Sequence, residues 1–508
     1  EAGVLAMDPV DVARARAWAA SKGFLRRATR RGEFFTVTAN VSVWEAALGC
    51  EFYDFVSASR VVTRCDGDYD ESSLPAGVEA VFGVSDLPPR TSKRRRGPPG
   101  AIATGNEVTP QVLNAFYRVD SNAGSDDVFQ GVFETSSQNY SPADLRIFAD
   151  TFDISDLATI TDVGGHASDS CSGNVNACSE GNLDVQYVVA TSQTSPTTYY
   201  YTDAANPFLA FAQYVADLTT APFVGSISWS SIEAEVSDAV KTAFDREVLK
   251  AALTGSSIFV SSGDDGVASF AATSADACKY EPSFPATSPF VVAVGATYNA
   301  DYSEPGRGEV ACQSDKHSAV ITSGGGFSTF YEAPDFTRGA IDGYFDGLFP
   351  DAVSGYNRSG RAYPDLSLSG YSYLVVIGGD LYAVSGTSCS APAVAAFASL
   401  VNAVRVEAGA EGLGYLLPQL YHPSSAAVFN DVTRGDNHCV AQNAFCCDQG
   451  FKATSGWDPV TGLGSLDYAA FEKAFTSDLD AAEVARAKRR LALRREVRHQ
   501  GAVFPSEE

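Results

Sequence analysis

The sequence predicts an α/β protein whose main domain is a doubly wound, mostly parallel sheet and whose N-terminal part is a small α+β domain. Short apolar runs of strand length alternate with helical runs between residues 107 and 475, a pattern typical of parallel sheets with helices on both faces. A stretch rich in Pro, Gly and basic residues separates that region from the first 84 residues. The 508-residue chain is 45% hydrophobic and 19% charged, which is an ordinary globular composition.

The N-terminal domain is expected to span residues 1–84. A helix is predicted over 10–23, where apolar residues recur at helical spacing. Strand-like runs follow at 33–39, 50–56 and 60–65, with a second helix predicted at 42–48. These elements are sufficient for a small α+β domain.

Residues 85–106 are the predicted linker. They combine Pro and Gly residues with the basic run from Lys93 to Arg96, and a segment of this composition is expected to be exposed rather than packed. Because the basic run stands between two domains, we interpret it as a processing site.

The main domain is expected to span residues 107–475. Its predicted elements include strands at 222–229, 256–266 and 289–296 and a helix at 388–407. Residues 476–508 follow as a C-terminal tail, in which 480–500 are predicted to form one basic, amphipathic surface helix.

Charge and hydropathy exclude two classes of partner. The formal net charge is −26, and residues 107–475 alone hold 15 basic and 43 acidic residues, a net charge of −28. Such a surface repels nucleic acid and anionic lipid, so we expect neither as a partner. No run of about 18 apolar residues is present, so we expect no membrane span. The chain begins at Glu1 without a basic-then-apolar leader, and we expect that an N-terminal portion such as a secretory signal precedes it.

The ten cysteines indicate disulfides rather than a zinc site. Their positions lack the paired C-x₂-C spacing of zinc ligands, whereas several disulfides fit an oxidising compartment. Cys171 can close a short loop with Cys178, and Cys439 can pair with either Cys446 or Cys447. Sequence alone does not decide the pairing.

Ser-Gly-Thr-Ser at 385–388 places Ser388 at the predicted start of a helix, where a nucleophilic serine is often presented. Cys389, the next residue, is expected to be a small buried side chain. A serine hydroxyl needs a base to take its proton. Among the five histidines, His166 is the best candidate for that base, but the sequence shows no third group to orient it. We therefore interpret His166 as a loop histidine without a catalytic role.

Carboxyl groups offer another base. Glu180 and Asp184 stand four residues apart in a predicted helix that Ser179 is expected to cap, so they share one face. Two carboxyl groups that close share a proton, and a Glu in such a pair can act as base and then as acid. This spacing usually marks a solvated face, but the apolar run at 185–189 indicates that the helix approaches a core.

A third acid, Asp264, stands directly after a predicted strand. Chemistry in α/β proteins gathers at the carboxyl ends of the strands, although an Asp at such a position is commonly only a turn former. A protonated Asp there can donate a hydrogen bond to a developing oxyanion.

Three motifs are decisive in combination: Ser-Gly-Thr-Ser with Ala391-Pro392, Glu180-x₃-Asp184-Val185-Gln186, and Ser262-Gly263-Asp264-x-Gly266. The whole region 361–392 and Ser-Gly-Gly-Gly-Phe-Ser at 323–328 add to them. Together they resemble the sedolisin family of serine-carboxyl peptidases. The resemblance covers nearly all of residues 8–475, with 33–82 similar to the activation prodomain of that family and 106–119 similar to the start of its catalytic domain.

The resemblance implies a subtilisin-like fold and a role for each acid. Glu180 replaces histidine as the base, and Asp184 orients and polarises it. Ser388 attacks the peptide carbonyl, and Asp264 completes the oxyanion hole.

The resemblance also implies partners and a cofactor. Polypeptide substrates are expected to lie extended beside Ser228, Trp229 and Ser230, although the family often has glycine at the last position. The chain's own prodomain is expected to act as an intramolecular inhibitor. A structural Ca²⁺ is expected from the family, and the matching positions are Asp431, the carbonyls of Val432, Thr454 and Gly456, and Asp458. Oxygen-only ligation of this kind suits calcium.

We therefore predict the proenzyme of an acid-acting serine-carboxyl peptidase, with either tripeptidyl-peptidase or endopeptidase activity. It is expected to be secreted or to reside in a lysosome or vacuole, and to be a monomer. One alternative is a neutral subtilisin-type protease that uses His166. Another is a catalytically inactive relative that serves as a binding protein.

Overall fold

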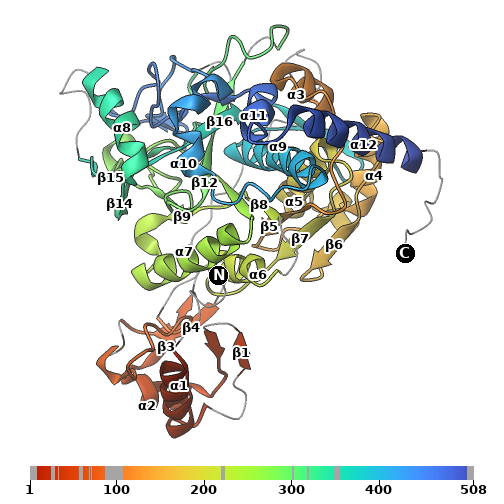
Figure 1. The fold of residues 1–508 in the computed structure, drawn as a ribbon. Helices are drawn as coiled ribbons and strands as arrows, with labels where there is room; N and C mark the ends of the chain where they lie inside the picture. Colours follow the sequence, from red (N-terminus) through yellow and green to blue (C-terminus); the bar gives the residue numbers. More distant parts are fainter. Residues whose placement is uncertain are drawn as a thin grey trace.

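The computed structural model describes residues 8–24, 29–31, 34–56, 61–67, 69, 71–85, 107–218, 223–299, 302–316, 320–347 and 355–499. Within these residues a small N-terminal body lies beside a large body that holds the parallel sheet (Figure 1). The fold class predicted from the sequence is confirmed. The predicted linker and its basic run lie almost wholly outside the described residues.

The N-terminal body combines two helices with two antiparallel strand pairs. The helices are α1 (Pro9–Ser21) and α2 (Val41–Leu48), and the strand pairs are β1 (Thr29–Arg31) with β2 (Phe34–Thr36) and β3 (Phe52–Val56) with β4 (Val61–Cys65). Its own core includes Phe24, Leu48 and Val84. Both predicted helices are present, whereas the run at 33–39 forms a strand of only three residues.

A ten-stranded sheet forms the centre of the large body. Its strands, from one edge to the other, are β19 (Phe429–Asn430), β22 (Ser465–Leu466), β16 (Leu366–Ser369), β12 (Val292–Tyr298), β10 (Ser257–Ser261), β8 (Phe223–Ile227), β5 (Phe129–Glu134), β7 (Thr197–Tyr201) and β6 (Ile160–Val163), with β13 (Val310–Ala311) paired to β12. The strands from β22 to β6 are all parallel, and β19 and β13 are antiparallel to their neighbours. The three strands predicted at 222–229, 256–266 and 289–296 are β8, β10 and β12.

Helices cover both faces of this sheet. On one face lie α3 (Pro110–Tyr117), α4 (Pro142–Thr151), α5 (Ser179–Thr191) and α9 (Thr387–Glu407), and on the other lie α6 (Pro207–Ala216) and α7 (Asp238–Leu253). Val224 and Phe259 point into the first core, whereas their neighbours Phe223 and Ile258 point into the second. Because both faces are buried, the strands are apolar at consecutive positions instead of alternating with polar residues.

A hairpin connects the two helices that matter most for function. It consists of β17 (Tyr373–Ile377) and β18 (Asp380–Val384), and β18 leads into α9. Gln186 of α5 accepts a hydrogen bond from Val376 N at 2.9 Å and donates one to Val376 O at 2.8 Å. Asp144 of α4 accepts from the backbone N–H groups of the turn, Gly378 and Gly379, at 2.8 Å each. The hairpin thus ties α5 to the strand that precedes Ser388.

Helix α9 is the central helix of the large body. Among the described residues it is the one helix that is long and apolar enough to cross a membrane, but 89% of its most apolar window is buried inside the protein. Polar residues interrupt this segment, so it is not the uninterrupted apolar run that was expected to be absent, and its high mean hydropathy is the apolar character that a core helix packed against a sheet needs.

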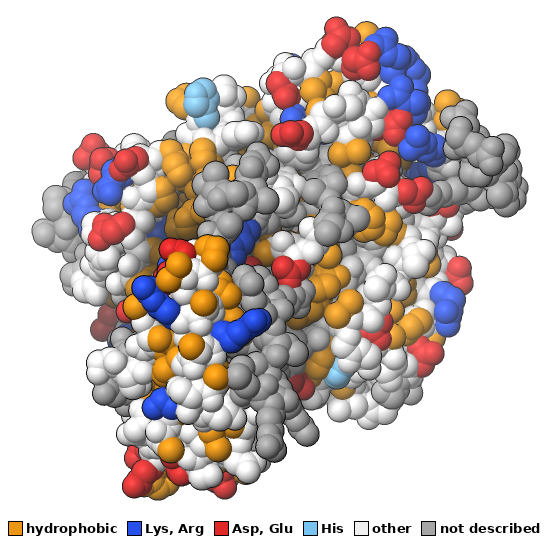
Figure 2. Space-filling view, turned by 60° about the horizontal axis from the view of Figure 1, so that its bottom comes forward, with side chains coloured by type: hydrophobic (Ala, Val, Ile, Leu, Met, Phe, Trp, Pro, Cys, Tyr) orange, Lys and Arg blue, Asp and Glu red, His pale blue; other side chains and the backbone are white. Residues whose placement is uncertain are grey.

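The predicted C-terminal helix is α12 (Ala481–His499). It packs on α9 through Ala487 and Leu491. Lys488 pairs with Glu472 at 2.6 Å, and Arg494 pairs with Glu407 at 3.0 Å. Figure 2 shows its basic side chains beside acidic ones at the upper right of the molecule. The tail helix therefore covers part of α9 rather than extending away from the body.

Four disulfides join cysteines of the described chain: Cys50–Cys65, Cys171–Cys178, Cys278–Cys447 and Cys439–Cys446. The proposed short loop between Cys171 and Cys178 is confirmed, and Cys439 takes Cys446 of its two possible partners. Cys312 and Cys389 are buried outside these bonds, as expected for Cys389.

Further helices and strand pairs complete the large body away from these elements. They are α8 (Asp335–Gly347), α10 (Leu417–Leu420), α11 (Tyr468–Phe475), and the pairs β9 (Ser231–Ile232) with β11 (Ser283–Phe284), β14 (Gly326–Glu332) with β15 (Gly360–Tyr363), and β20 (Cys439–Val440) with β21 (Phe445–Cys446).

Candidate active site

Ser388 is the second residue of α9. Gly386 is the N-cap of this helix, so the Ser388 side chain stands in the first turn, where the helix directs unpaired N–H groups and a positive dipole end. Only 4% of Ser388 is exposed, and its hydroxyl donates to the carbonyl of Ser228 at 3.1 Å. The predicted nucleophile therefore contacts the segment predicted to bind substrate.

Asp264 lies against the start of the same helix. It follows β10 at the carboxyl end of the sheet, as the sequence predicted. Its Oδ1 accepts hydrogen bonds from Thr387 N at 2.7 Å and from Thr387 Oγ1 at 2.9 Å. The Thr387 hydroxyl in turn accepts from Gly263 N at 3.2 Å. These bonds hold the Asp264 carboxyl group beside the residue that precedes Ser388.

Glu180 and Asp184 both lie on α5, in its first and second turns. They are 5% and 0% exposed, so their helix face is buried and not the solvated face that such spacing usually marks. α5 packs against α9, the helix that carries Ser388. One detail was wrong: Cys178 is the N-cap of α5, and Ser179 is its first helical residue.

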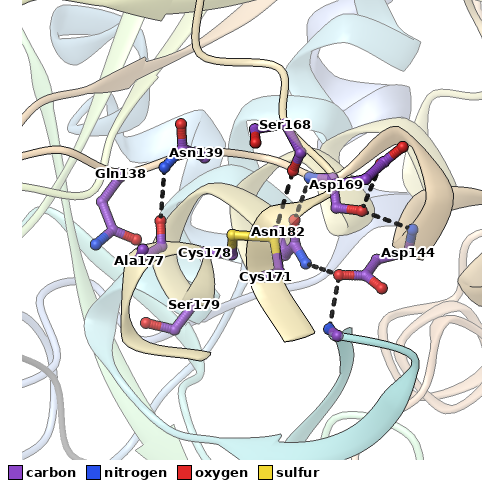
Figure 3. Close-up of a disulfide and its surroundings, with 12 residues drawn as sticks. Gln138, Asn139, Asp144, Ser168, Asp169, Cys171, Ala177, Cys178, Ser179 and Asn182 are labelled. Carbon is purple, nitrogen blue, oxygen red and sulfur yellow. Dashed lines mark hydrogen bonds between the residues drawn. A yellow bond between two sulfur atoms is a disulfide. The ribbon is translucent and has the colours of Figure 1, made fainter. Parts of the chain in front are cut away.

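The start of α5 is held by the loop after β5. Gln138 Oε1 accepts from Glu180 N at 3.1 Å, and Gln138 Nε2 donates to the carbonyl of Asn176 at 2.9 Å. Asn139 N donates to the carbonyl of Ala177 at 2.7 Å. Figure 3 shows this loop beside the disulfide that precedes the helix.

The structure adds a buried carboxylate that motif analysis missed. Glu134, at the end of β5, is 0% exposed and accepts a hydrogen bond from the indole N–H of Trp229 at 2.9 Å. Burial first, and then the charges of Glu134 and Asp184, raise the pKa of Tyr199 well above its ordinary value. Glu134 therefore belongs to the same buried region as Asp184. Its position at a strand end is the one signal in the sequence, because no motif surrounds it.

The three residues predicted to bind substrate follow β8. Ser228, Trp229 and Ser230 are buried, with exposures of 7%, 7% and 5%. Trp229 belongs to the core on the α6–α7 face, and Phe82 of the N-terminal body packs against that core. The predicted substrate segment is thus close-packed in this form of the chain.

The His166 ring contacts Tyr201 and the loop that contains Gln138. Its ring stacks on Tyr201 with a centroid separation of 3.3 Å, and its Nδ1 lies 3.0 Å from the carbonyl of Gln138. These contacts occupy the ring face and one ring nitrogen. They support the interpretation of His166 as a loop histidine.

The five residues predicted to hold calcium come together from two loops. Asp431 Oδ2 accepts from Gly456 N at 3.0 Å, and Asp458 Oδ2 accepts from Thr454 N at 3.0 Å. The Thr461 hydroxyl bridges the Val432 carbonyl at 3.4 Å and the Asp458 carboxylate at 3.2 Å. Burial raises the pKa of Asp458 to about 7. Two carboxylates with nearby carbonyls form an oxygen donor set that fits Ca²⁺.

Comparisons with known proteins identify the family of the chain. The profile of the subtilase family matches residues 155–412. Physarolisin of Physarum polycephalum is 30% identical over 469 residues, which cover 84% of this chain and 79% of that protein. Tripeptidyl-peptidase 1 of Homo sapiens is 30% identical over 460 residues, which cover 87% of this chain and 78% of that protein.

A solved structure supports the same fold. Pseudomonas sedolisin, a serine-carboxyl proteinase complexed with two molecules of pseudo-iodotyrostatin, superposes with a TM-score of 0.57 at 23% identity, covering 74% of this chain and 100% of that chain. The fold and the profile define a subtilase-type peptidase. Within that class, the chain belongs to the sedolisin family of serine-carboxyl peptidases.

Proposed function

We propose that the chain is the proenzyme of an acid-acting serine-carboxyl peptidase that hydrolyses peptide bonds through an acyl-enzyme. The observation that carries the proposal is the pair of hydrogen bonds from Thr387 to the Asp264 carboxyl group, at 2.7 and 2.9 Å. These bonds place an acid at the helix start from which Ser388 presents its hydroxyl. A buried Glu and Asp stand on the helix packed against it.

In the proposed reaction, the Ser388 oxygen attacks the peptide carbonyl carbon while Glu180 takes the hydroxyl proton. Asp184, one helical turn further on, orients Glu180 and shares its proton. Glu180 then returns the proton to the leaving amine, and the peptide bond breaks to give the ester of Ser388. Water attacks this ester by the same route, and Glu180 acts again as base.

The oxyanion that forms in each attack is proposed to lie beside the N-terminus of α9. Backbone N–H groups of the first turn and the helix dipole favour negative charge there. Asp264, when protonated, donates a hydrogen bond to the same oxygen. Acid pH favours the protonated form of Asp264, which is the form that can donate. A carboxylate base such as Glu180 also works at lower pH than an imidazole does.

The N-terminal domain is proposed to be the inhibitory prodomain. Glu79 pairs with Arg246 of α7 at 2.5 Å, and Phe82 packs against the core that contains Trp229. Residues 79–85 thus reach the face of the large body that adjoins the proposed substrate segment. Cleavage within 85–106 would release this contact. We keep the proposed boundaries of 1–84, 107–475 and 476–508 for the three parts.

We propose that Ca²⁺ binds at Asp431, Asp458 and the carbonyls of Val432, Thr454 and Gly456, and that it stabilises the loops that contain them. The ion would neutralise two carboxylates and would have no part in catalysis. Chelation with EGTA is expected to lower the melting temperature while Asp431→Asn abolishes that response. An unchanged melting temperature after chelation would contradict the calcium site.

The disulfides support a proposal for the compartment in which the protein acts. Four disulfides fit an oxidising compartment, and we propose a secreted or lysosomal location. Polypeptides are the proposed substrates, with Ser228, Trp229 and Ser230 beside the bound chain. We propose a monomer that binds neither nucleic acid nor membrane.

The test is cleavage of a peptide library at about pH 4, near the pKa of a free carboxyl group, by the processed protein and by its Ser388→Ala and Glu180→Gln variants. Only the unaltered protein is expected to cleave. Peptides with free and acetylated N-termini separate the two activities, since a tripeptidyl-peptidase releases tripeptides only from free ends.

Two results would replace this proposal. Activity that peaks above about pH 7 and disappears in His166→Ala would indicate the neutral protease. Failure to cleave denatured protein anywhere between about pH 3 and 7, the span in which paired carboxyl groups titrate, would indicate the inactive relative.

A further inference from the structure

The residue at the N-cap position of α5 makes no side-chain cap hydrogen bond. This residue is Cys178. The backbone of Cys178 has φ −126° and ψ 1°, whereas residues that cap helices through a side-chain oxygen adopt an extended conformation. The side chain at the N-cap position therefore does not hold this helix start, and the one hydrogen bond described above at this turn comes from outside the helix, where Gln138 Oε1 accepts from Glu180 N at 3.1 Å.

A covalent bond is made by the N-cap residue instead. Cys178 is joined to Cys171 in the short 3₁₀ helix at Ser170–Gly173. Both cysteines are buried, at 0% and 1% exposure. Figure 3 shows the disulfide at the N-terminus of α5, next to Ser179.

The disulfide acts on the turn that contains Glu180. The first turn of a helix is the part that frays, because its N–H groups lack intrahelical partners. Glu180 lies in this turn, two residues after Cys178. Asp184 lies one turn further on, beyond Asn182, whose side chain donates to Asp144 at 2.8 Å and to Val376 O at 2.9 Å.

Position 182 is thus fixed by side-chain hydrogen bonds, whereas the turn before it depends on Cys178 and on the loop at Gln138 and Asn139. We propose that the Cys171–Cys178 disulfide is a positioning element for the reaction: it fixes the first turn of α5 so that the Glu180 carboxyl group is held toward Ser388. This inference rests on the proposed function, because it assigns the base to Glu180.

The chain contains a matched control for this disulfide. Cys439 and Cys446 are also seven residues apart in sequence, as Cys171 and Cys178 are. In the chain-entropy description, bonds that close loops of equal length stabilise the fold by similar amounts. Loss of either bond is therefore expected to lower the melting temperature by a similar amount, while only one of the two precedes Glu180.

The experiment compares the processed forms of Cys171→Ser/Cys178→Ser and Cys439→Ser/Cys446→Ser on one peptide substrate at about pH 4, near the pKa of a free carboxyl group. The first variant is expected to lose about 10- to 100-fold in kcat, the loss that a displacement of about 1 Å causes at a catalytic group. Its KM is expected to change less than threefold. The control is expected to keep kcat within about twofold.

A second comparison distinguishes positioning from general damage. In the Glu180→Gln background, loss of the disulfide is expected to leave the residual kcat unchanged, because the group that it positions is already absent. A further drop of similar size in that background would overturn the inference. An equal drop in kcat for both disulfide variants would do the same.

The remaining outcomes are also decisive. Thiol titration of the denatured protein should detect Cys312 and Cys389 alone, and reactive thiols at 171 and 178 would overturn the inference. If the Ser pair does not fold, Cys171→Ala/Cys178→Val fills the buried space and enters the same comparison. Full activity of Glu180→Gln alone would instead refute the proposed function. Failure of the proposed function can therefore be distinguished from failure of the inference about the disulfide.

Discussion

Helices α9 and α5 each present a candidate catalytic side chain from the first turn, Ser388 from α9 and Glu180 from α5, yet the two turns are held by different means. Hydrogen bonds hold the start of α9, where the Asp264 carboxyl group accepts from Thr387. A disulfide and a surface loop hold the start of α5.

The difference follows from where each helix begins. α9 starts beside the carboxyl end of β10, so the loop that directly follows a strand of the sheet supplies its partner, Asp264. α5 starts after two short 3₁₀ helices, Ser170–Gly173 and Val175–Ala177, which are not part of the sheet. A covalent bond therefore provides there the rigidity that the sheet provides at α9. If the two side chains act together as proposed, the catalytic geometry depends on support that differs from one helix to the other.

The largest effect is expected when the chemical group is removed from each helix start. Ser388→Ala and Glu180→Gln should each lower kcat by about 10³-fold or more, because nucleophile and base act as a unit. Their double variant should be little worse than either alone. The measurement is kcat at about pH 4 on one peptide, near the pKa of a free carboxyl group.

Additive losses in that double variant would show that the two residues do not act in one step. Circular dichroism and melting temperature serve as the control, since each variant should stay folded. In that case Ser388 and Glu180 would not be nucleophile and base of the same reaction, and the two helix starts would not form one active site.

Removing the acid that bridges β10 and α9 should have the next largest effect. Asp264→Asn keeps the size and an acceptor oxygen for Thr387 but changes the group that faces the oxyanion. We expect kcat to fall by about 10²- to 10³-fold, the usual loss when one oxyanion donor is altered. KM should change little, because the interaction develops only in the transition state. A rise in KM with unchanged kcat would assign Asp264 to substrate binding instead.

Much of this arrangement can be predicted from the sequence. Consecutive apolar residues in 222–229 and 289–296 predicted strands buried on both faces, and the motifs around Glu180, Asp264 and Ser388 were recognisable at fixed local spacing. Local patterns reach only a few residues along the chain. The partnership of Cys278 with Cys447, 169 residues away, has no such local signal.

The two points that the sequence did not predict correctly, Glu134 and the N-cap of α5, also depend on contacts that local patterns do not show. Glu134 lies next to Trp229 only because β5 and β8 are neighbours in the sheet. The cap of α5 was misassigned to Ser179, since propensity favours serine at that position, whereas the N-cap residue is Cys178, which is joined to Cys171. Tertiary and covalent constraints decided both points.

A smaller effect is expected from the hydroxyl that supports α9. Thr387→Val keeps the shape of the side chain but removes its bonds to Asp264 Oδ1, at 2.9 Å, and to Gly263 N, at 3.2 Å. We expect a loss of about tenfold in kcat and of about 1–2 kcal/mol in the free energy of unfolding. Ser399→Ala on the same helix is the control, because in the described part of the chain its hydroxyl donates within the helix, to Ala395 O. Equal losses of kcat in both variants would show a general effect on α9.

The smallest expected effect is on the free energy of unfolding. It tests whether the pH dependence of stability is independent of the pH dependence of catalysis at the two helix starts. Asp245 of α7, on the opposite face of the sheet, has a pKa raised to about 7, chiefly by burial, although Ser288, Tyr331 and Lys241 lower it. Its ordinary value is near 3.8. The folded state therefore binds this proton more tightly than the unfolded chain does. The resulting stabilisation is complete below about pH 4 and is lost as the pH rises to about 7.

The consequence can be measured against Asp245→Asn, which cannot ionise. Between about pH 4 and 7 the free energy of unfolding of the unaltered protein should fall relative to the variant by up to about 1.4 kcal/mol per pH unit. Asp342→Asn, at an exposed position of α8, is the control for the loss of a surface carboxyl group. The pH dependence of kcat should be the same in all three proteins, because the proposed function assigns it to Glu180 and Asp264, which are unaltered in them. If Asp245→Asn changed the pH dependence of kcat as well, acid preference would arise from the fold and not from the two helix starts alone.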